Sequence, residues 1–332
     1  MSQLRFNPLA GRWVAVAADR AARPQDFAST RVPVEPGPRR PCPFCPGNEE
    51  ETPPALETYG PQGRWLVRVV PNLYPAFVGS GALEVTEISP LFHQAPAKGI
   101  HEVLVLGPDH SQSWADLDDR QTALVMAAIR DRVEEHARAR GIAYTQVIVN
   151  HGREAGASIE HPHGQLLGIP FVPTEIAEEL RATQSFPDGP LMKVLIEAEL
   201  EAACRIVHDD EQVLVVCPFW AGSPYELLVV PKTPAAHLDN VAPADLVAVG
   251  RAIRTSLRRI RSLLGDVAYN IVFHSAPHDA DGDSMWWHVH IRPAVTTTAG
   301  FEQGTGVRIN VVPPELAASQ LTSATVTADI RH

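Results

Sequence analysis

The same order of elements occurs twice along the chain, and this repetition constrains the fold more than any other feature of the sequence. In each half, hydrophobic patterning predicts two strands, then an amphipathic helix, then a third strand that leads into a histidine-rich stretch. The predicted elements cover residues 65–70, 101–106, 121–140 and 145–150 in the first half, and 212–217, 226–231, 244–264 and 268–273 in the second.

Histidines repeat in register with these elements. His110 follows the second strand of the first half, and a His-x-His pair begins 51 residues later at His161. His237 and His288 repeat that spacing in the second half. The shared order and spacing indicate an internal duplication of an α+β unit, against the alternative that two similar orders coincide by chance. We place the two units at residues 1–173 and 174–332.

Length and charge narrow the class of protein. A chain of 332 residues has room for about two domains, and 45% apolar with 20% charged residues is typical of a globular enzyme. The formal net charge is −11 and no basic run offsets it, so neither nucleic acid nor an anionic membrane is an expected partner. No apolar run approaches the roughly 20 residues that span a bilayer, and four cysteines are too few for a disulfide framework. We therefore expect a cytoplasmic protein.

Cys42 and Cys45 form a Cys-x-x-Cys pair inside residues 20–62, a stretch rich in proline, arginine and glycine that lacks periodicity. This composition predicts an irregular arm that is ordered by contacts made elsewhere. The pair is either redox-active or half of a zinc site, and the flanking prolines favour a metal-pinned loop over two reduced thiols. Cys204 and Cys217 are expected to be small core residues.

The segment His161-Pro-His163-Gly-Gln165 carries the strongest chemical signal. In an extended chain, residues two apart point the same way, so the two imidazoles can project together while the proline stiffens the backbone and the glycine leaves room for a ligand. The pair is either a nucleophile with a neighbouring ligand or base, or two histidines at the edge of the core. The adjacent Gln165 and the glycine-containing loop at residues 150–158 favour the first interpretation.

Several motifs together resemble galactose-1-phosphate uridylyltransferase, a tandem member of the histidine-triad superfamily. They extend from about Asn7 to Leu321 and occur in the family's order: Cys42-x-x-Cys45, Pro108-Asp-His110-Ser, Gly156-Ala-Ser158, His161-Pro-His-Gly-Gln165, Pro218-Phe-Trp-Ala221 and Trp287-His288-Val-His290. The resemblance implies an α+β fold of two tandem histidine-triad-like units, each an antiparallel sheet with packed helices. It also implies a homodimer that acts on a nucleotide sugar and a sugar 1-phosphate.

The resemblance further implies a ping-pong reaction of galactose metabolism. His163 attacks the α-phosphorus of UDP-glucose, glucose 1-phosphate leaves, and galactose 1-phosphate then takes the uridylyl group. A neutral imidazole suits both steps, because it is a good nucleophile at pH 7 and a reasonable leaving group. Gln165 would donate a hydrogen bond to a phosphoryl oxygen. Family positions that bind substrate correspond to Arg20, Arg23, Asn72, Asn150, Gly156, Ser158, Gln165 and Glu302.

Two metal sites are implied in the same way. In the family, His110 and His161 complete a structural zinc site with Cys42 and Cys45, which makes His161 structural and His163 chemical. A second site, for iron or zinc, corresponds to Glu179, His274, His288 and His290. Glu175 and Glu178 are rivals of Glu179 if the register slips.

Three departures from the family pattern leave the substrate open. Leu73 replaces an acidic residue common in uridylyltransferases, residues 296–298 are threonines where a lysine is expected, and Phe301 replaces a tyrosine. Related enzymes that act on ADP-sugars share parts of these segments, so an ADP-sugar phosphorylase or adenylyltransferase is the alternative within the same chemistry. A noncatalytic nucleotide- or metal-binding protein is the alternative from another class, although binding alone requires no nucleophile.

Overall fold

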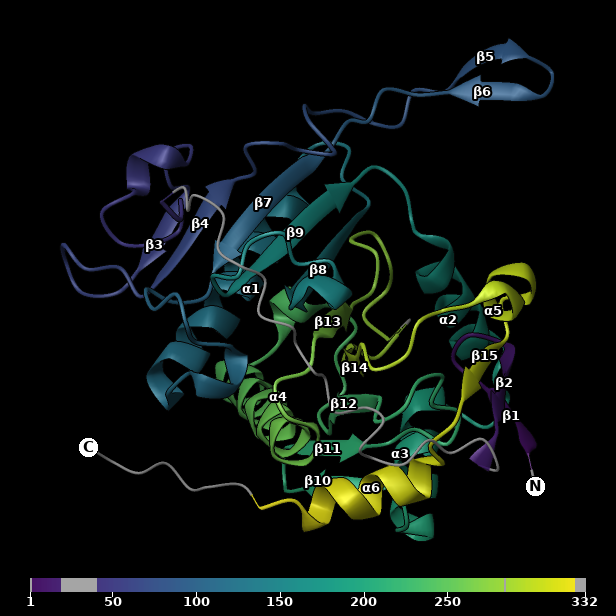
Figure 1. The fold of residues 1–332 in the computed structure, drawn as a ribbon. Helices are drawn as coiled ribbons and strands as arrows, with labels where there is room; N and C mark the ends of the chain where they lie inside the picture. Colours follow the sequence, from purple (N-terminus) through teal and green to yellow (C-terminus); the bar gives the residue numbers. More distant parts are fainter. Residues whose placement is uncertain (1, 19–40, 284, 326–332) are drawn as a thin grey trace.

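A ten-stranded antiparallel sheet forms the centre of the computed structural model, which describes residues 2–18, 41–283 and 285–325 (Figure 1). Arg20 and Arg23 lie outside the described residues. In spatial order the strands are β10 (Ile206–Asp209), β11 (Val213–Val216), β12 (Leu227–Pro231), β14 (His288–Pro293), β13 (Tyr269–His274), β8 (Tyr144–His151), β9 (His163–Ile169), β7 (Ile100–Val105), β4 (Val67–Pro71) and β3 (Glu57–Tyr59).

The strand order shows the duplication directly. Read outward from the centre, the first half runs β8-β9-β7-β4-β3 and the second runs β13-β14-β12-β11-β10, so each strand has a counterpart across the β8–β13 contact. At that contact Asn150 pairs with Asn270 and Val149 with Ile271. The expected α+β fold of two tandem units is confirmed, but their sheets are continuous. Pairing β8 with β13 removes two strand edges that would otherwise offer unpaired backbone groups.

Helices α1 (Asp119–Arg138) and α4 (Pro243–Leu264) are also counterparts, and they pack together on one face of the sheet (Figure 1). Asp118 caps α1 by accepting the amide N–H of Gln121 at 2.6 Å. Gly250 permits the close approach of the two helices, because a Cβ there would lie 2.7 Å from Cγ of Met126. Alternate residues of the strands, such as Val147, Val149, Ile271 and Phe273, fill the core beneath them.

On the opposite face of the sheet, helices cover mainly the strands from the second half of the chain. Helices α2 (Thr174–Ser185) and α3 (Leu191–Ala202) follow the first half of the chain, and α3 packs against Leu214, Val216, Leu228 and Val230. On the same face, side chains near the centre of the sheet are only half-buried. They include Asn150, Gln165 and Asn270, so this uncovered centre is where polar groups of both halves meet.

Smaller elements surround the main sheet. Strands β1 (Gln3–Asn7), β2 (Arg12–Val16) and β15 (Arg308–Asn310) form a separate sheet, and the hairpin of β5 (Thr86–Ser89) and β6 (Phe92–Gln94) projects away from the body (Figure 1). The last helices are α5 (Gly300–Thr305) and α6 (Pro314–Ser323). Among the described helices, none combines the length and the apolar character needed to cross a membrane.

One packing expectation is wrong. Cys217 is buried, as predicted, but Cys204 is exposed. The reason is local, because α3 ends at Ala202 and Ala203 takes a left-handed conformation with φ of 52°. This turn places the next side chain outside the core.

Candidate active site and metal sites

His163 is the first residue of β9, on the sheet face that α1 and α4 leave uncovered. Its Nδ1 donates a hydrogen bond to the backbone carbonyl of His161 at 2.8 Å. This bond fixes the tautomer, so Nε2 is left unprotonated with its lone pair available. Nε2 makes no hydrogen bond within the described part of the chain, which is the arrangement required of a nucleophilic imidazole.

The surroundings of His163 favour its neutral form. Burial lowers the pKa of the imidazole below its usual value, and the bond to the His161 carbonyl opposes this only in part. The ring of Phe44, between the two cysteines of the arm, packs against it with centroids 5.3 Å apart. Phe44 also contacts His161, at 6.0 Å. Sequence reasoning did not single out Phe44, although an aromatic residue inside a Cys-x-x-Cys is a signal that could have found it.

Gln165 and Asn72, both predicted site residues, meet at a third side chain that the sequence did not single out. His101 of β7 has its Nε2 2.8 Å from Oε1 of Gln165 and 3.0 Å from Nδ2 of Asn72. No local signal marks His101, because its partner Gln165 lies 64 residues away along the chain.

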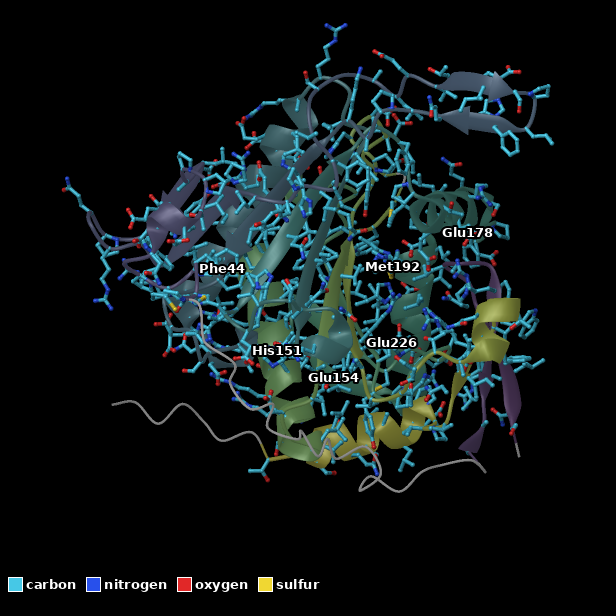
Figure 2. All side chains as sticks on the ribbon, turned by 45° about the horizontal axis from the view of Figure 1, so that its top comes forward. Phe44, His151, Glu154, Glu178, Met192 and Glu226 are labelled. Atoms are coloured by element: carbon cyan, nitrogen blue, oxygen red, sulfur yellow. The ribbon has the colours of Figure 1, made fainter. Side chains whose placement is uncertain are left out.

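Asn150 and the loop after β8 border the other side of His163. Asn150 accepts a hydrogen bond from the side chain of Asn270 at 2.8 Å, which ties the two halves together. Gly156 has a φ of 89°, which favours glycine, and together Asn150, Gly152, Ala157 and His163 line one small pocket. Ser158 is exposed on the same loop. Figure 2 labels His151, the last residue of β8, and Glu154 of this loop.

Glu302 is not brought to this pocket by the chain itself. It lies on α5, which Figure 1 places next to β15 and β2 rather than beside β9. Its carboxylate accepts the backbone N–H of Ala299, the residue that precedes this helix, at 3.1 Å. The part of the molecule that carries Glu302 is therefore separate from the part that carries His163.

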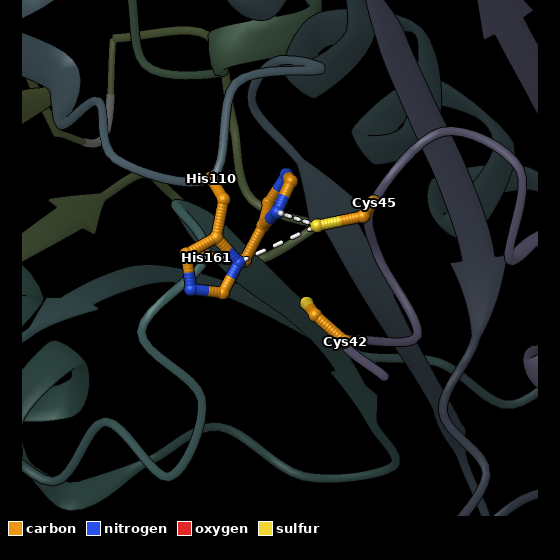
Figure 3. Close-up of side chains that lie close together, drawn as sticks. All are labelled: Cys42, Cys45, His110 and His161. Atoms are coloured by element: carbon orange, nitrogen blue, oxygen red, sulfur yellow. Dashed lines mark hydrogen bonds between the residues drawn. The ribbon is translucent and has the colours of Figure 1, made fainter. Parts of the chain in front are cut away.

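The predicted first metal cluster comes together from three segments (Figure 3). Sγ of Cys45 lies 3.4 Å from Nδ1 of His110 and 3.7 Å from Nδ1 of His161. Two ligand atoms on one tetrahedral zinc are separated by about 3.5 Å for a sulfur and a nitrogen. Nε2 of His161 hydrogen-bonds the Gly107 carbonyl at 2.7 Å, which directs Nδ1 toward the thiols. The four residues fit a metal ion.

The second cluster is buried and places Glu179, rather than its rivals, among the three histidines. Oε1 of Glu179 lies 2.8 Å from Nδ1 of His274, and Oε2 lies 3.8 Å from Nε2 of His288. Glu175 and Glu178 instead pair with Arg12 of β2. On α2, Glu179 thus faces the three histidines, whereas Glu175 and Glu178 face Arg12.

Unpartnered atoms show that this cluster also fits a metal. Within the described residues, Oε2 of Glu179, Nε2 of His288 and both ring nitrogens of His290 are buried without a hydrogen-bond partner. Such atoms are costly unless an ion engages them. Burial lowers the pKa of His288 to about 4 and that of His290 to about 3, so both rings are neutral, as metal ligands must be.

The second cluster predicts different metal contents for variants of two neighbouring glutamates, Glu179 and Glu178. Glu179→Gln is expected to remove about one metal ion per chain, because an amide replaces the only anionic ligand of the set. Elemental analysis of the purified protein measures this. Glu178→Gln is the matched control and should keep the full metal content, since Glu178 pairs with Arg12 at the surface. The reverse result would contradict the ligand assignment.

Comparisons with known proteins show which proteins this chain resembles. Family models described as the N-terminal and C-terminal domains of galactose-1-phosphate uridyl transferase match residues 1–173 and 177–303. An ADP-glucose phosphorylase of Arabidopsis thaliana is 31% identical over 98% of this chain and 93% of its own. A galactose-1-phosphate uridylyltransferase of Thermotoga maritima is 28% identical over 97% and 98%. A crystal structure of the Arabidopsis phosphorylase with bound ADP-glucose superposes with a TM-score of 0.83 at 27% identity, covering 98% of this chain and all of that one.

The duplicated sheet, with the buried His163 and with Gln165 on its uncovered face, and the matching family models identify the protein as a nucleotidyltransferase of the histidine-triad kind. The chain belongs to the galactose-1-phosphate uridylyltransferase family.

Proposed function

We propose that the protein transfers a uridylyl group from UDP-glucose to a hexose 1-phosphate, with galactose 1-phosphate as the acceptor, through a covalent intermediate on His163. The observation that carries the proposal is the tautomer of His163, with Nδ1 bonded to the His161 carbonyl and Nε2 free. A protein that only binds nucleotides would not require this arrangement.

In the first step, Nε2 of His163 forms a bond to the α-phosphorus, and the bond from that phosphorus to the bridging oxygen breaks. Glucose 1-phosphate leaves with the electron pair of that bond. The imidazole then carries the nucleotidyl group on Nε2 and a proton on Nδ1, and the His161 carbonyl stabilises this cationic ring. In the second step, a phosphate oxygen of the acceptor attacks the same phosphorus and Nε2 is released. Gln165 and Asn150 would donate hydrogen bonds to the phosphoryl oxygens while negative charge is redistributed among these oxygens.

A specific observation favours a second candidate, phosphorolysis of ADP-glucose. The Arabidopsis relative that covers nearly the whole chain is an ADP-glucose phosphorylase. Beside Asn72, Leu73 is 58% exposed, so an apolar side chain stands where uridylyltransferases often have an acid. Both candidates use the same covalent step and differ in the base and in the acceptor.

Paired donors and acceptors distinguish the candidates. The protein is mixed with UDP-glucose or ADP-glucose labelled at the α-phosphate and quenched in alkali, and acid-labile label on the protein is counted. We expect label from UDP-glucose that galactose 1-phosphate discharges as UDP-galactose. Label from ADP-glucose alone, discharged by inorganic phosphate as ADP, would establish the second candidate instead. Absence of label from both donors would contradict the covalent mechanism.

The remaining expectations complete the proposal. The set of two cysteines and two histidines favours zinc, and the set of one glutamate and three histidines suits iron or zinc. In the first site Cys42, Cys45, His110 and His161 would hold the metal, which would cross-link the arm to the segment that carries His163 and so have a structural role. We also propose a cytoplasmic homodimer, two units divided at residues 173 and 174, and substrate contacts from Arg20, Arg23, Asn72, Gly156 and Ser158. Because Glu302 lies apart from His163 within one chain, its proposed substrate contact would be made to the site of the other protomer.

A further inference from the structure

His101 lies between Asn72 and Gln165, two of the predicted substrate-binding residues. It belongs to β7, and the loop after β4 lies against it. The backbone N–H of Asn72 donates to the backbone carbonyl of His101 at 2.8 Å. The backbone N–H of Ala76 donates to Nδ1 of the ring at 3.0 Å. The other ring nitrogen, Nε2, faces Oε1 of Gln165 at 2.8 Å and Nδ2 of Asn72 at 3.0 Å.

These contacts determine where the imidazole carries its proton. A backbone N–H can only donate, so Nδ1 of His101 must be an acceptor and cannot be protonated. A neutral imidazole without a proton on Nδ1 has it on Nε2. Nε2 therefore donates to Oε1 of Gln165.

The donated proton in turn orients the glutamine. Because Oε1 of Gln165 accepts from His101, the amide nitrogen of Gln165 is on the opposite side of the group. The glutamine side chain makes no other hydrogen bond within the described residues, so both its N–H groups remain available to a phosphoryl oxygen. Without His101, the amide could rotate and present its carbonyl oxygen to the phosphate, which would repel it.

Asn72 is oriented at the same point. Its Oδ1 accepts the backbone N–H of Tyr74 at 2.9 Å, which turns Nδ2 toward His101. Nε2 of His101 has one proton and no in-plane lone pair, so Nδ2 of Asn72 cannot donate to it. The N–H groups of Asn72 are therefore available to an acceptor on a ligand.

We propose that His101 is a positioning residue for nucleotidyl transfer: it holds the Gln165 amide with its donor end toward the transferred phosphoryl group. This inference rests on the proposed function, because it assigns a role within the same covalent step. His101 also lies between Gln165, expected at the phosphate, and Asn72, which matches a family position near the uracil.

The test uses two replacements of His101 that differ in one property. His101→Phe keeps a planar ring and removes the donor, and it is expected to slow labelling of His163 at saturating nucleotide sugar by about 10- to 100-fold. His101→Gln offers an amide N–H in place of Nε2–H and should restore most of the rate. His93→Phe, on the exposed strand β6, is the control and should leave the rate unchanged. Equal losses in the Phe and Gln variants would overturn the proposal.

A double-mutant cycle shows whether His101 acts through Gln165. If it does, adding His101→Phe to Gln165→Ala should cost less than about threefold, because the amide it positions is already absent. If the rate loss of the double variant equals the product of the two single losses, His101 acts independently of Gln165 and the proposal is wrong.

A measurement without substrate keeps this inference separate from the proposed function. Nitrogen-15 NMR of histidine-labelled protein should show His101 neutral and protonated on Nε2, and His101→Phe should shift the side-chain amide signals of Gln165. If no nucleotide sugar labels wild-type protein, the proposed function fails while these signals still test the His101–Gln165 contact. If labelling succeeds but His101 is protonated on Nδ1, the inference fails and the proposed function stands.

Discussion

Replacing His163 with glycine is expected to abolish covalent labelling by a nucleotide sugar and to lower turnover by at least about 10⁴-fold. The imidazole is the only group in the described pocket that combines a free, unprotonated nitrogen with burial that lowers its pKa. Its removal forces the acceptor to displace the sugar phosphate directly, which the site is not arranged to assist. Retention of acid-labile label and rapid-quench turnover measure the two effects.

Gln165→Ala is the matched control for this variant. This replacement removes a hydrogen-bond donor but not the nucleophile, so turnover should fall by about 10²- to 10³-fold while label still accumulates on the protein. Wild-type labelling in His163→Gly would show that another side chain forms the intermediate. Equal and complete loss of label in both variants would show that the two residues do not have the separate roles proposed for them.

Replacing Cys42 with serine is expected to lower the metal content by about one ion per chain and the melting temperature by about 10 °C. Structural zinc sites of this kind contribute several kcal/mol or more to folding, and in a chain of this size each kcal/mol shifts the midpoint by about 2 °C. Because His161 is both a predicted ligand and the hydrogen-bond acceptor for His163, nucleotidyl transfer should fall as well. Elemental analysis, thermal unfolding and labelling measure the three effects.

Cys204→Ser controls for the loss of a thiol as such. Cys204 is exposed and lies outside both clusters, so its replacement should change neither the metal content nor the melting temperature. If Cys42→Ser keeps its metal and its melting temperature, the cluster of two cysteines and two histidines does not bind an ion and the arm is ordered by protein contacts alone. Phe44, packed on His161 and His163, would then be the contact to replace next.

The duplication could be predicted because its signals are local. Strand alternation and helical periodicity are set by residues a few positions apart, and the 51-residue spacing between histidines repeats with them. The helix predicted at 121–140 is α1 at Asp119–Arg138, and the one at 244–264 is α4 at Pro243–Leu264. The merging of the two sheets through β8 and β13 could not be read from the same patterns, since pairing between distant edge strands leaves no periodic trace.

The glutamates of α2 also show what local sequence patterns cannot predict. Glu175, Glu178 and Glu179 are equivalent as carboxylates, and counting along the sequence could only favour one of them. The structure separates them because successive residues of a helix point in different directions: Glu179 faces the histidines and the other two face Arg12.

The sequence by itself determined the residue types that could act as nucleophile and ligands, the His-Pro-His-Gly-Gln segment that holds two of them, and the repeated order of elements. Only the tertiary structure decided which distant groups meet. It placed Cys45 beside His110 and His161, respectively 65 and 116 residues away, and put His101 against Gln165. The physical reason is that periodicity reports the environment of each short segment, whereas contacts across the sheet depend on strand order and register, which long-range packing sets.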